Sequence, residues 1–304
     1  MTPRGRYAPS PTGTTHLGNA STALLAWLSV RSRRGAYVIR MEDLDRPRVV
    51  AGAADAILRD LRWLGLDWDE GPDASGPYAP YVQSERGAHY EAAFERLRAA
   101  GLVYPCFCSR KDIQSAASAP QAPGDEAHYP GTCRDLPRSE VARRVASGRA
   151  HAWRFRVDPA GILPFTDLVR GRYEADPGSI GDFVVRRADG VPAYQLAVVA
   201  DDIAMNLSEV VRGDDLLPST IRQLLLYRAL GASPPAFAHV PLLLGDDGVR
   251  LSKRHRGVTL HELRDAGESA EAIVGRLAHR HGLRETAAPV AARELVEGFD
   301  LAVL

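Results

Sequence analysis

One segment of the chain combines residue types that could hold a nucleoside triphosphate. The segment RYAPSPTGTTHLGN, from Arg6 to Asn19, places a proline-rich turn, the imidazole of His16 and Gly18 directly before a predicted helix. Unpaired N–H groups and the dipole at a helix start favour a phosphate, and Gly18 lets a nucleotide approach the backbone. His16 could donate hydrogen bonds to phosphate oxygens. Taken alone, the segment also fits a turn with an N-terminal histidine cap.

A second segment, VRLSKRH, places Lys253 in a polar loop after the apolar run PLLLGDDG. A mobile lysine near a triphosphate could neutralise the charge that grows on the phosphates during displacement at the α-phosphorus. A preorganised contact of this kind is worth roughly 2.7 to 4 kcal/mol in a transition state. The alternative is a solvated basic loop, which is the usual fate of such a run.

The three cysteines, Cys106, Cys108 and Cys133, lie close together in the sequence. In a chain without an export signal, an odd and tightly clustered set favours metal ligation over disulfides. Structural zinc is normally tetrahedral, so a fourth ligand is needed, and His128 would complete an ordinary Cys₃His site. The alternative is three reduced, buried cysteines without a metal.

The elements that position these residues are typical of an α/β protein. Residues 1–101 alternate strand and helix, with strands predicted over Arg4–Ala8 and Ala36–Met41. This alternation predicts a parallel sheet that is covered by helices. Glu42 follows the second strand, at the carboxyl edge where ligands of such sheets usually bind.

The alternation of strands and helices is interrupted between residues 102 and 180. This interruption predicts an insertion that contains the cysteines and a strand over His151–Val157. The sheet resumes at Asp182–Arg187, and an Asp-Gly turn predicts a second strand over Ala193–Ala200. Ser219 is expected to cap a helix that runs to Leu230. The predicted parts are residues 1–101 and 181–240 for the sheet domain, 102–180 for the insertion, and 241–304 for the Lys253 loop and short helices, with no separate large C-terminal domain.

Composition supports a globular protein and limits its partners. The chain has 304 residues, of which 45% are hydrophobic and 25% charged, with 38 basic and 38 acidic side chains. Zero net charge means that any nucleic-acid surface must be a local patch. The sequence has neither a secretory core nor an apolar run long enough to span a bilayer, so we expect a cytoplasmic protein with no membrane partner. GxGxxG and Walker A motifs are absent, so dehydrogenase and P-loop nucleotide sites are unsupported.

In combination, these motifs resemble a known family. HLGN resembles the HIGH signature of class I aminoacyl-tRNA synthetases, and RLSKR resembles their KMSKS loop. The segments RYAPSPTGTTHLG, RMEDLD, AYQLAVVADD and EVVRGDDL are similar to the glutamyl branch. The short length, the lack of an anticodon-binding domain and the pattern CFC followed by YPGTC resemble the glutamyl-Q tRNA(Asp) synthetases. The chain departs from the signatures at Asn19, Arg250, Leu251 and Arg254, whereas Lys253 is retained.

The resemblance implies a Rossmann-like nucleotide-binding domain with a small zinc-bearing insertion and a short helical C-terminal part. It also implies activation of L-glutamate by ATP with Mg²⁺, without tRNA, and transfer of glutamate to the queuosine base at the wobble position of tRNA(Asp). We expect a monomer. The implied catalytic residues are His16, Gly18 and Lys253, and the implied ATP-binding residues are these three and Asn19. The implied glutamate-binding residues are Arg6, Ala8, Ser10, Glu42, Tyr194 and Arg212.

Glutamate requires one acid for its ammonium and cations for its two carboxylates, preferably guanidinium groups. We assign the ammonium to Glu42 and the carboxylates to Arg6 and Arg212, without deciding which arginine binds which carboxylate. The alternative for Glu42 is a surface carboxylate that pairs with Arg40 or Arg46. For Arg212 it is a salt bridge to Asp214 or Asp215.

The family pattern Tyr-x-x-x-Cys points to Tyr129 as the fourth ligand of one structural Zn²⁺ per chain, with His128 as the alternative. Three rival functions remain: a truncated or discriminating glutamyl-tRNA synthetase that charges the terminal adenosine, a small-molecule adenylyltransferase, and a non-catalytic RNA-binding paralogue. Two arginine clusters could contribute to a tRNA-facing patch, although solvated helix faces are the default interpretation. They are Arg31, Arg33 and Arg34, and Arg143, Arg144 and Arg149.

Overall fold

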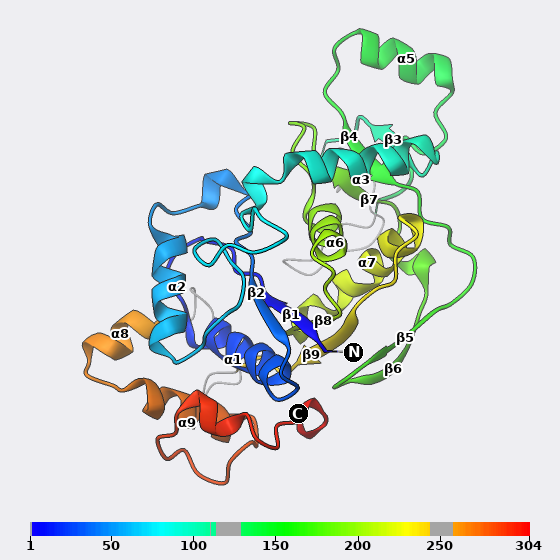
Figure 1. Ribbon diagram of the computed structural model, residues 1–304. Coiled ribbons are helices and arrows are strands. Elements are labelled where there is room, and N and C mark those ends of the chain that lie inside the picture. Colours follow the sequence, from blue (N-terminus) through cyan, green and yellow to red (C-terminus); the bar gives the residue numbers. More distant parts are fainter. Residues whose placement is uncertain (1, 110, 114–128, 244–257) are drawn as a thin grey trace.

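A six-stranded sheet forms the centre of the protein in the computed structural model, which describes residues 2–109, 111–113, 129–243 and 258–304 (Figure 1). Its strand order is β2-β1-β8-β9-β5-β6. All neighbouring strands are parallel except β5 and β6, which form an antiparallel pair at one edge. The bounds are β1 Arg4–Tyr7, β2 Ala36–Ile39, β5 Leu163–Asp167, β6 Gly171–Ala175, β8 Glu209–Gly213 and β9 Ala236–Val240.

Helices cover both faces of this sheet, as the alternation of strands and helices predicts. Consecutive strand residues face opposite sides, so Val210 of β8 packs in one core cluster and Val211 in the other. The cluster with Val211 lies against α1, α2 and α9, and the cluster with Val210 lies against α3, α6 and α7. The helix bounds are α1 Leu17–Arg31, α2 Ala53–Trp63, α3 Gly87–Ala99, α6 Tyr194–Ala204, α7 Leu217–Ala229, α8 Leu260–Asp265 and α9 Ala270–Arg280.

A separate three-stranded antiparallel sheet contains the first cysteine at the end of one strand. Its order is β3-β4-β7, with β3 Val103–Cys106, β4 Ala152–Phe155 and β7 Phe183–Arg186. Helix α5, Arg138–Ala146, projects beyond this sheet and has no buried residue (Figure 1). Strands β5 and β6 lie within the range predicted for the insertion, yet they extend the main sheet beside β9. The 102–180 boundaries therefore remain a prediction.

Three local predictions were wrong. The strand expected over Asp182–Arg187 forms as β7, but it pairs with β4 in the small sheet and does not continue the main sheet. The turn at Asp189-Gly190 forms, but Ala193 is the N-cap of α6, so residues 194–200 are helical and not a strand. An apolar run such as YQLAVVA fits a buried helix as well as a strand, which explains the error. Helix α7 begins at Leu217, with Pro218 in its first turn, so Ser219 lies inside the helix and does not cap it.

Short 3₁₀ helices lie at Arg46–Arg48, Gln83–Glu85, Pro177–Ser179, Asp214–Leu216, Ala292–Leu295 and Leu301–Val303. Within the ranges that the structure describes, no helix is both long and apolar enough to cross a membrane.

Candidate functional site

The turn after β1 leads to a helix start that is available for an anion. His16 is the N-cap of α1 in extended backbone conformation, and its side chain makes no capping hydrogen bond. His16 therefore occupies the N-cap position, as the alternative predicts, but its side chain does not bond to the N–H groups of the helix. Gly18 lies in the first turn of α1, which contains no acidic residue, and Asn19 next to it is exposed. The N–H of Leu17 is bonded to Val258, and the dipole and the following N–H groups of this helix start can bind a phosphate group.

The segment that carries Lys253 lies outside the described residues, but the chain that follows it is attached to the same turn. Val258 accepts a hydrogen bond at 3.3 Å from the N–H of Leu17, and the N–H of Leu260 donates to Thr15 at 2.9 Å. These bonds bring residues 258–260 beside His16, with which Thr259 forms a β-bridge. From Val258 onward, the chain therefore lies beside the start of α1.

Glu42 lies beyond the end of β2 in a buried position. Its N–H donates to Pro9 at 2.9 Å, which joins it to the loop after β1. Its carboxylate lies 3.0 Å from Arg40, and its side chain is only 8% exposed. Burial raises the pKa of Glu42, and the charges of Arg40 and Arg6 oppose this shift. The predicted alternative was right about Arg40 as a partner but wrong about a surface location.

Arg40 is the centre of a buried charge network that the sequence did not reveal. Its guanidinium lies 2.6 Å from Asp202, 3.0 Å from Glu42 and 3.5 Å from Asp201, and it is fully buried. Asp201 also lies 2.5 Å from the buried Arg86. Both aspartates end the segment AYQLAVVADD on α6. Their proximity to Arg40 could not be predicted from the sequence, because it depends on the tertiary structure. The network holds the carboxylate of Glu42 in place.

Two further buried arginines lie on the strands at the point where the strand order of the sheet reverses. From β1 the chain proceeds to β2 on one side, while β8 lies on the other side, and such switch points are where α/β sheets bind ligands. Arg6 of β1 has its Nε 3.8 Å from Asp202. Arg212 of β8 is 3% exposed and has no ion pair among the described residues, because Asp214 pairs with Arg170 instead. The predicted salt bridge of Arg212 to Asp214 or Asp215 is therefore not observed in the described part of the chain.

These groups act on one another electrostatically. Burial lowers the pKa of Arg212, and the positive charge of Arg6 lowers it further. Tyr194, at the start of α6, is 40% exposed and lies within the fields of Glu42, Arg212 and Arg6. The fold therefore brings together four of the six residues predicted to bind glutamate. Ala8, half-buried, and Ser10, exposed, lie on the loop after β1.

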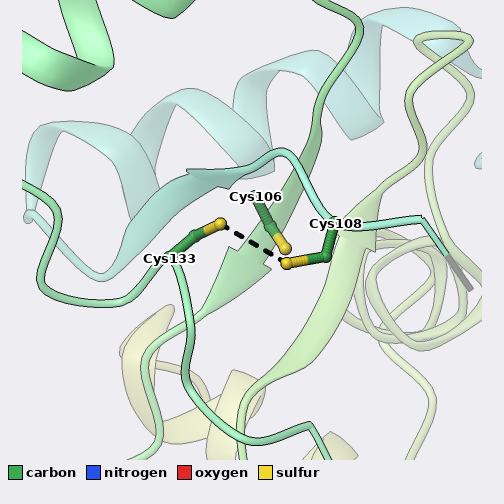
Figure 2. A group of neighbouring side chains, drawn as sticks. All are labelled: Cys106, Cys108 and Cys133. Atoms are coloured by element: carbon green, nitrogen blue, oxygen red, sulfur yellow. Dashed lines mark hydrogen bonds between the residues drawn. The ribbon is translucent and has the colours of Figure 1, made fainter. Parts of the chain in front are cut away.

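The three cysteines converge beyond the end of β3 (Figure 2). Their sulfur atoms all lie within 4.8 Å of one another, and Cys108 and Cys133 are 3.6 Å apart. The Tyr129 hydroxyl lies 3.3 Å from the sulfur of Cys106 and accepts a hydrogen bond at 2.7 Å from the N–H of Cys133. His128 lies outside the described residues. Three soft donors and a phenolic oxygen fit a tetrahedral zinc site, in which Tyr129 would supply the fourth ligand.

We expect the Cys133→Ser variant to lose zinc and to destabilise the small sheet, because one of three clustered thiolates is removed. Glutamate activation should remain largely intact, since the cluster lies outside the Glu42 and Arg212 site. Native mass spectrometry should find about one zinc per wild-type chain, as for a closed structural site. Thr132→Ser, at the exposed neighbouring residue, is the matched control. Loss of activation in a folded, zinc-free variant would show that the two sites depend on each other.

Comparison with known proteins agrees with this geometry. The family model of tRNA synthetases class I (E and Q), catalytic domain, matches residues 3–302. The chain is 54% identical over 299 residues to a Glutamyl-Q tRNA(Asp) synthetase of Symbiobacterium thermophilum, covering 98% of this chain and 92% of the relative. It is 46% identical over 302 residues to a Glutamate–tRNA ligase of Anaeromyxobacter, covering 98% of this chain and 62% of that relative.

A solved structure shows the same fold. The glutamate-tRNA synthetase of Elizabethkingia anophelis superposes with a TM-score of 0.88 at 31% identity, and the match covers 99% of this chain. This chain spans 66% of the length of that structure. The helix start with the HLGN motif, the sheet order and the match over residues 3–302 together show that this chain belongs to the class I tRNA synthetases of the E and Q group and is a ligase.

Proposed function

We propose that this protein activates L-glutamate with ATP and transfers the glutamyl group to the queuosine base at the wobble position of tRNA(Asp). The activation of glutamate is supported by the buried set of Glu42, Arg6 and Arg212 at the switch point of the sheet. One carboxylate and two guanidiniums complement the ammonium and two carboxylates of glutamate. The set lies on the same edge of the sheet as the start of α1.

In the proposed reaction, an oxygen of the glutamate α-carboxylate attacks the α-phosphorus of ATP in line, and pyrophosphate leaves. The N–H groups at the start of α1 and the side chain of His16 bind phosphate oxygens, while Lys253 neutralises the charge that develops on them. Mg²⁺ bound with ATP supplies further positive charge. A hydroxyl of the RNA then attacks the carbonyl carbon of the glutamyl-adenylate, and AMP leaves.

The identity of the acceptor rests on the relatives. Those named Glutamyl-Q tRNA(Asp) synthetase are 54%, 51% and 50% identical to this chain. Those named Glutamate–tRNA ligase are 44% to 47% identical. This difference supports the queuosine acceptor. Transfer to the terminal adenosine is the second candidate, which the similarity to the glutamate–tRNA ligases favours.

The acceptor is tested with labelled glutamate on tRNA(Asp) with and without queuosine, and on tRNA(Glu). We expect glutamate-dependent ATP–pyrophosphate exchange without any tRNA, and label only on the queuosine-containing tRNA(Asp). Nuclease fragments should place that label in the anticodon loop. Label on the terminal adenosine, or equal charging of queuosine-free tRNA(Asp), would establish the second candidate. Exchange without preference for glutamate would contradict both.

A further inference from the structure

Three neighbouring strands bring together a buried aspartate, histidine and arginine. Arg212 of β8 lies opposite His239 of β9 in the strand register, and Asp167 ends β5 on the other side of β9. Asp167 and His239 have fully buried side chains, and Arg212 is 3% exposed. Neither Asp167 nor His239 belongs to the residues predicted to bind glutamate or ATP.

A continuous hydrogen-bond chain links these residues. An oxygen of Asp167 lies 2.6 Å from Nδ1 of His239. The Nε–H of Arg212 lies 3.1 Å from Nε2 of His239, and the Thr220 hydroxyl lies 2.9 Å from that same nitrogen. A guanidinium N–H can only donate, so Nε2 must be the acceptor. His239 is therefore neutral and carries its proton on Nδ1.

Asp167 selects this tautomer of His239. Its Oδ1 accepts hydrogen bonds from the N–H groups of Val169, Arg170 and His239 at 2.9 to 3.1 Å. Its Oδ2 therefore faces Nδ1 as a fixed acceptor and keeps the proton there. Burial lowers the pKa of His239, and the Arg212 charge also lowers it, against the opposing effect of Asp167. A second cation beside Arg212 is thus disfavoured.

The protein orients the guanidinium of Arg212 and leaves part of it unused. Nε–H donates to His239, Nη1 donates to Gln223 at 2.9 Å, and Nη2 donates to Thr220 at 2.7 Å. All three acceptors are neutral, so within the described part of the chain no carboxylate bonds directly to Arg212, and Asp202 acts on it only through space. Since a guanidinium has five N–H groups, one N–H remains on each terminal nitrogen. That is the number needed for a bidentate carboxylate.

We propose that Asp167 and His239 are positioning residues that fix the guanidinium of Arg212 so that its two remaining N–H groups bind a carboxylate of the amino-acid substrate. The inference rests on the proposed binding of glutamate by Arg212. It adds that affinity for the amino acid depends on the tautomer of a histidine that does not contact the substrate.

Asp167→Asn tests this dependence because the change conserves size. The three backbone N–H groups hold the amide oxygen of Asn at the Oδ1 position, which turns its NH₂ toward Nδ1 of His239. Nδ1 must then accept, so the proton moves to Nε2 and meets the Nε–H of Arg212. This donor–donor contact should displace the guanidinium. We expect the KM for glutamate to rise about tenfold or more, as for loss of a charged hydrogen bond, with the KM for ATP unchanged.

A double-mutant cycle separates positioning from general stability. Glutamine has no tautomers and can present its oxygen to Arg212, so His239→Gln should retain most of the affinity for glutamate, whereas His239→Leu should lose it. In the His239→Leu background, Asp167→Asn should have little further effect on the KM for glutamate, because leucine cannot transmit the change to Arg212. Asp176→Asn is the matched control, because Asp176 is an exposed cap just after β6 and Asn caps about as well. All variants are assayed by ATP–pyrophosphate exchange without tRNA, with thermal unfolding in parallel.

Nitrogen-15 NMR of labelled histidine reports which ring nitrogen of His239 carries the proton. A purely structural role of Asp167 would leave this proton position unchanged. The His239 signal, assigned by its loss in His239→Gln, should show the proton on Nδ1 in the wild type and on Nε2 in Asp167→Asn. A wild-type proton on Nε2, additive effects in the cycle, or an equal rise in both KM values would overturn the inference. If Asp167→Asn does not fold, the His239→Gln and His239→Leu pair decides.

Failure of the proposed function can be distinguished from failure of this inference. If the wild type shows no glutamate-dependent exchange, the substrate is wrong, and the NMR signal still reports the tautomer. If exchange occurs but Arg212→Gln leaves the KM for glutamate unchanged, Arg212 does not bind the substrate and the inference falls with it. If Arg212→Gln raises this KM but Asp167→Asn does not, only the positioning role is wrong.

Discussion

Replacing Lys253 by alanine should slow glutamyl-adenylate formation about 100- to 1000-fold, as does loss of one preorganised donor in other active sites. The KM for glutamate should change much less, because the lysine acts on charge that grows on the phosphates only in the transition state. The described chain supports this position, since residues 258–260 are bonded to the turn that contains His16. Single-turnover adenylate formation, measured with saturating glutamate and ATP, gives the rate.

Lys111 provides the matched control, because Lys111 and Lys253 are the two lysines of the chain. Lys111 is exposed near the cysteine cluster, so Lys111→Ala should leave the rate of adenylate formation unchanged. If Lys253→Ala weakened glutamate binding and slowed adenylate formation to the same extent, Lys253 would contribute only to binding of the ground state.

The Glu42→Gln variant should have a KM for glutamate about 10- to 100-fold above that of the wild type, which is the range for loss of a charged hydrogen bond. The amide is isosteric but cannot balance an ammonium group. Arg40 keeps Asp201 and Asp202 as partners, so the network around it should persist. Asp45→Asn is the control, because Asp45 forms only a partly exposed pair with Arg48 in the described structure. An unchanged KM in Glu42→Gln would remove Glu42 from the substrate site.

The pH dependence provides an independent check on Glu42. Burial raises its pKa, so on acidification it becomes neutral at a higher pH than an exposed glutamate does. Only the ionised form can pair with the ammonium, and kcat/KM reports groups of the free enzyme. The wild-type kcat/KM for glutamate should therefore fall as the pH drops toward the raised pKa. The Glu42→Gln variant should not show this fall in kcat/KM at acidic pH. An identical fall in the variant would assign the titration to another group.

Local sequence determined the elements that carry the nucleotide turn and the metal ligands. Strand β1, the turn and helix α1 are consecutive, so residue types alone predict that His16 and Gly18 lie at a helix start. The spacing of the cysteines likewise predicted their convergence, which the distances among their sulfur atoms confirm. The family also followed from sequence, because its motifs are short contiguous segments in a fixed order.

Tertiary structure decided what depends on residues far apart in the chain. An apolar run such as residues 194–200 can form a helix or a strand, and the packing of α6 against α3 and α7 selects the helix. The burial of Glu42 and its network with Arg40 and Asp202 arise because β2 and α6 meet only in the fold. Asp167, His239 and Arg212 come from strands that neighbour one another only in the sheet. Periodicity and spacing report contacts within one element, whereas hydrogen bonds between elements depend on how the chain packs.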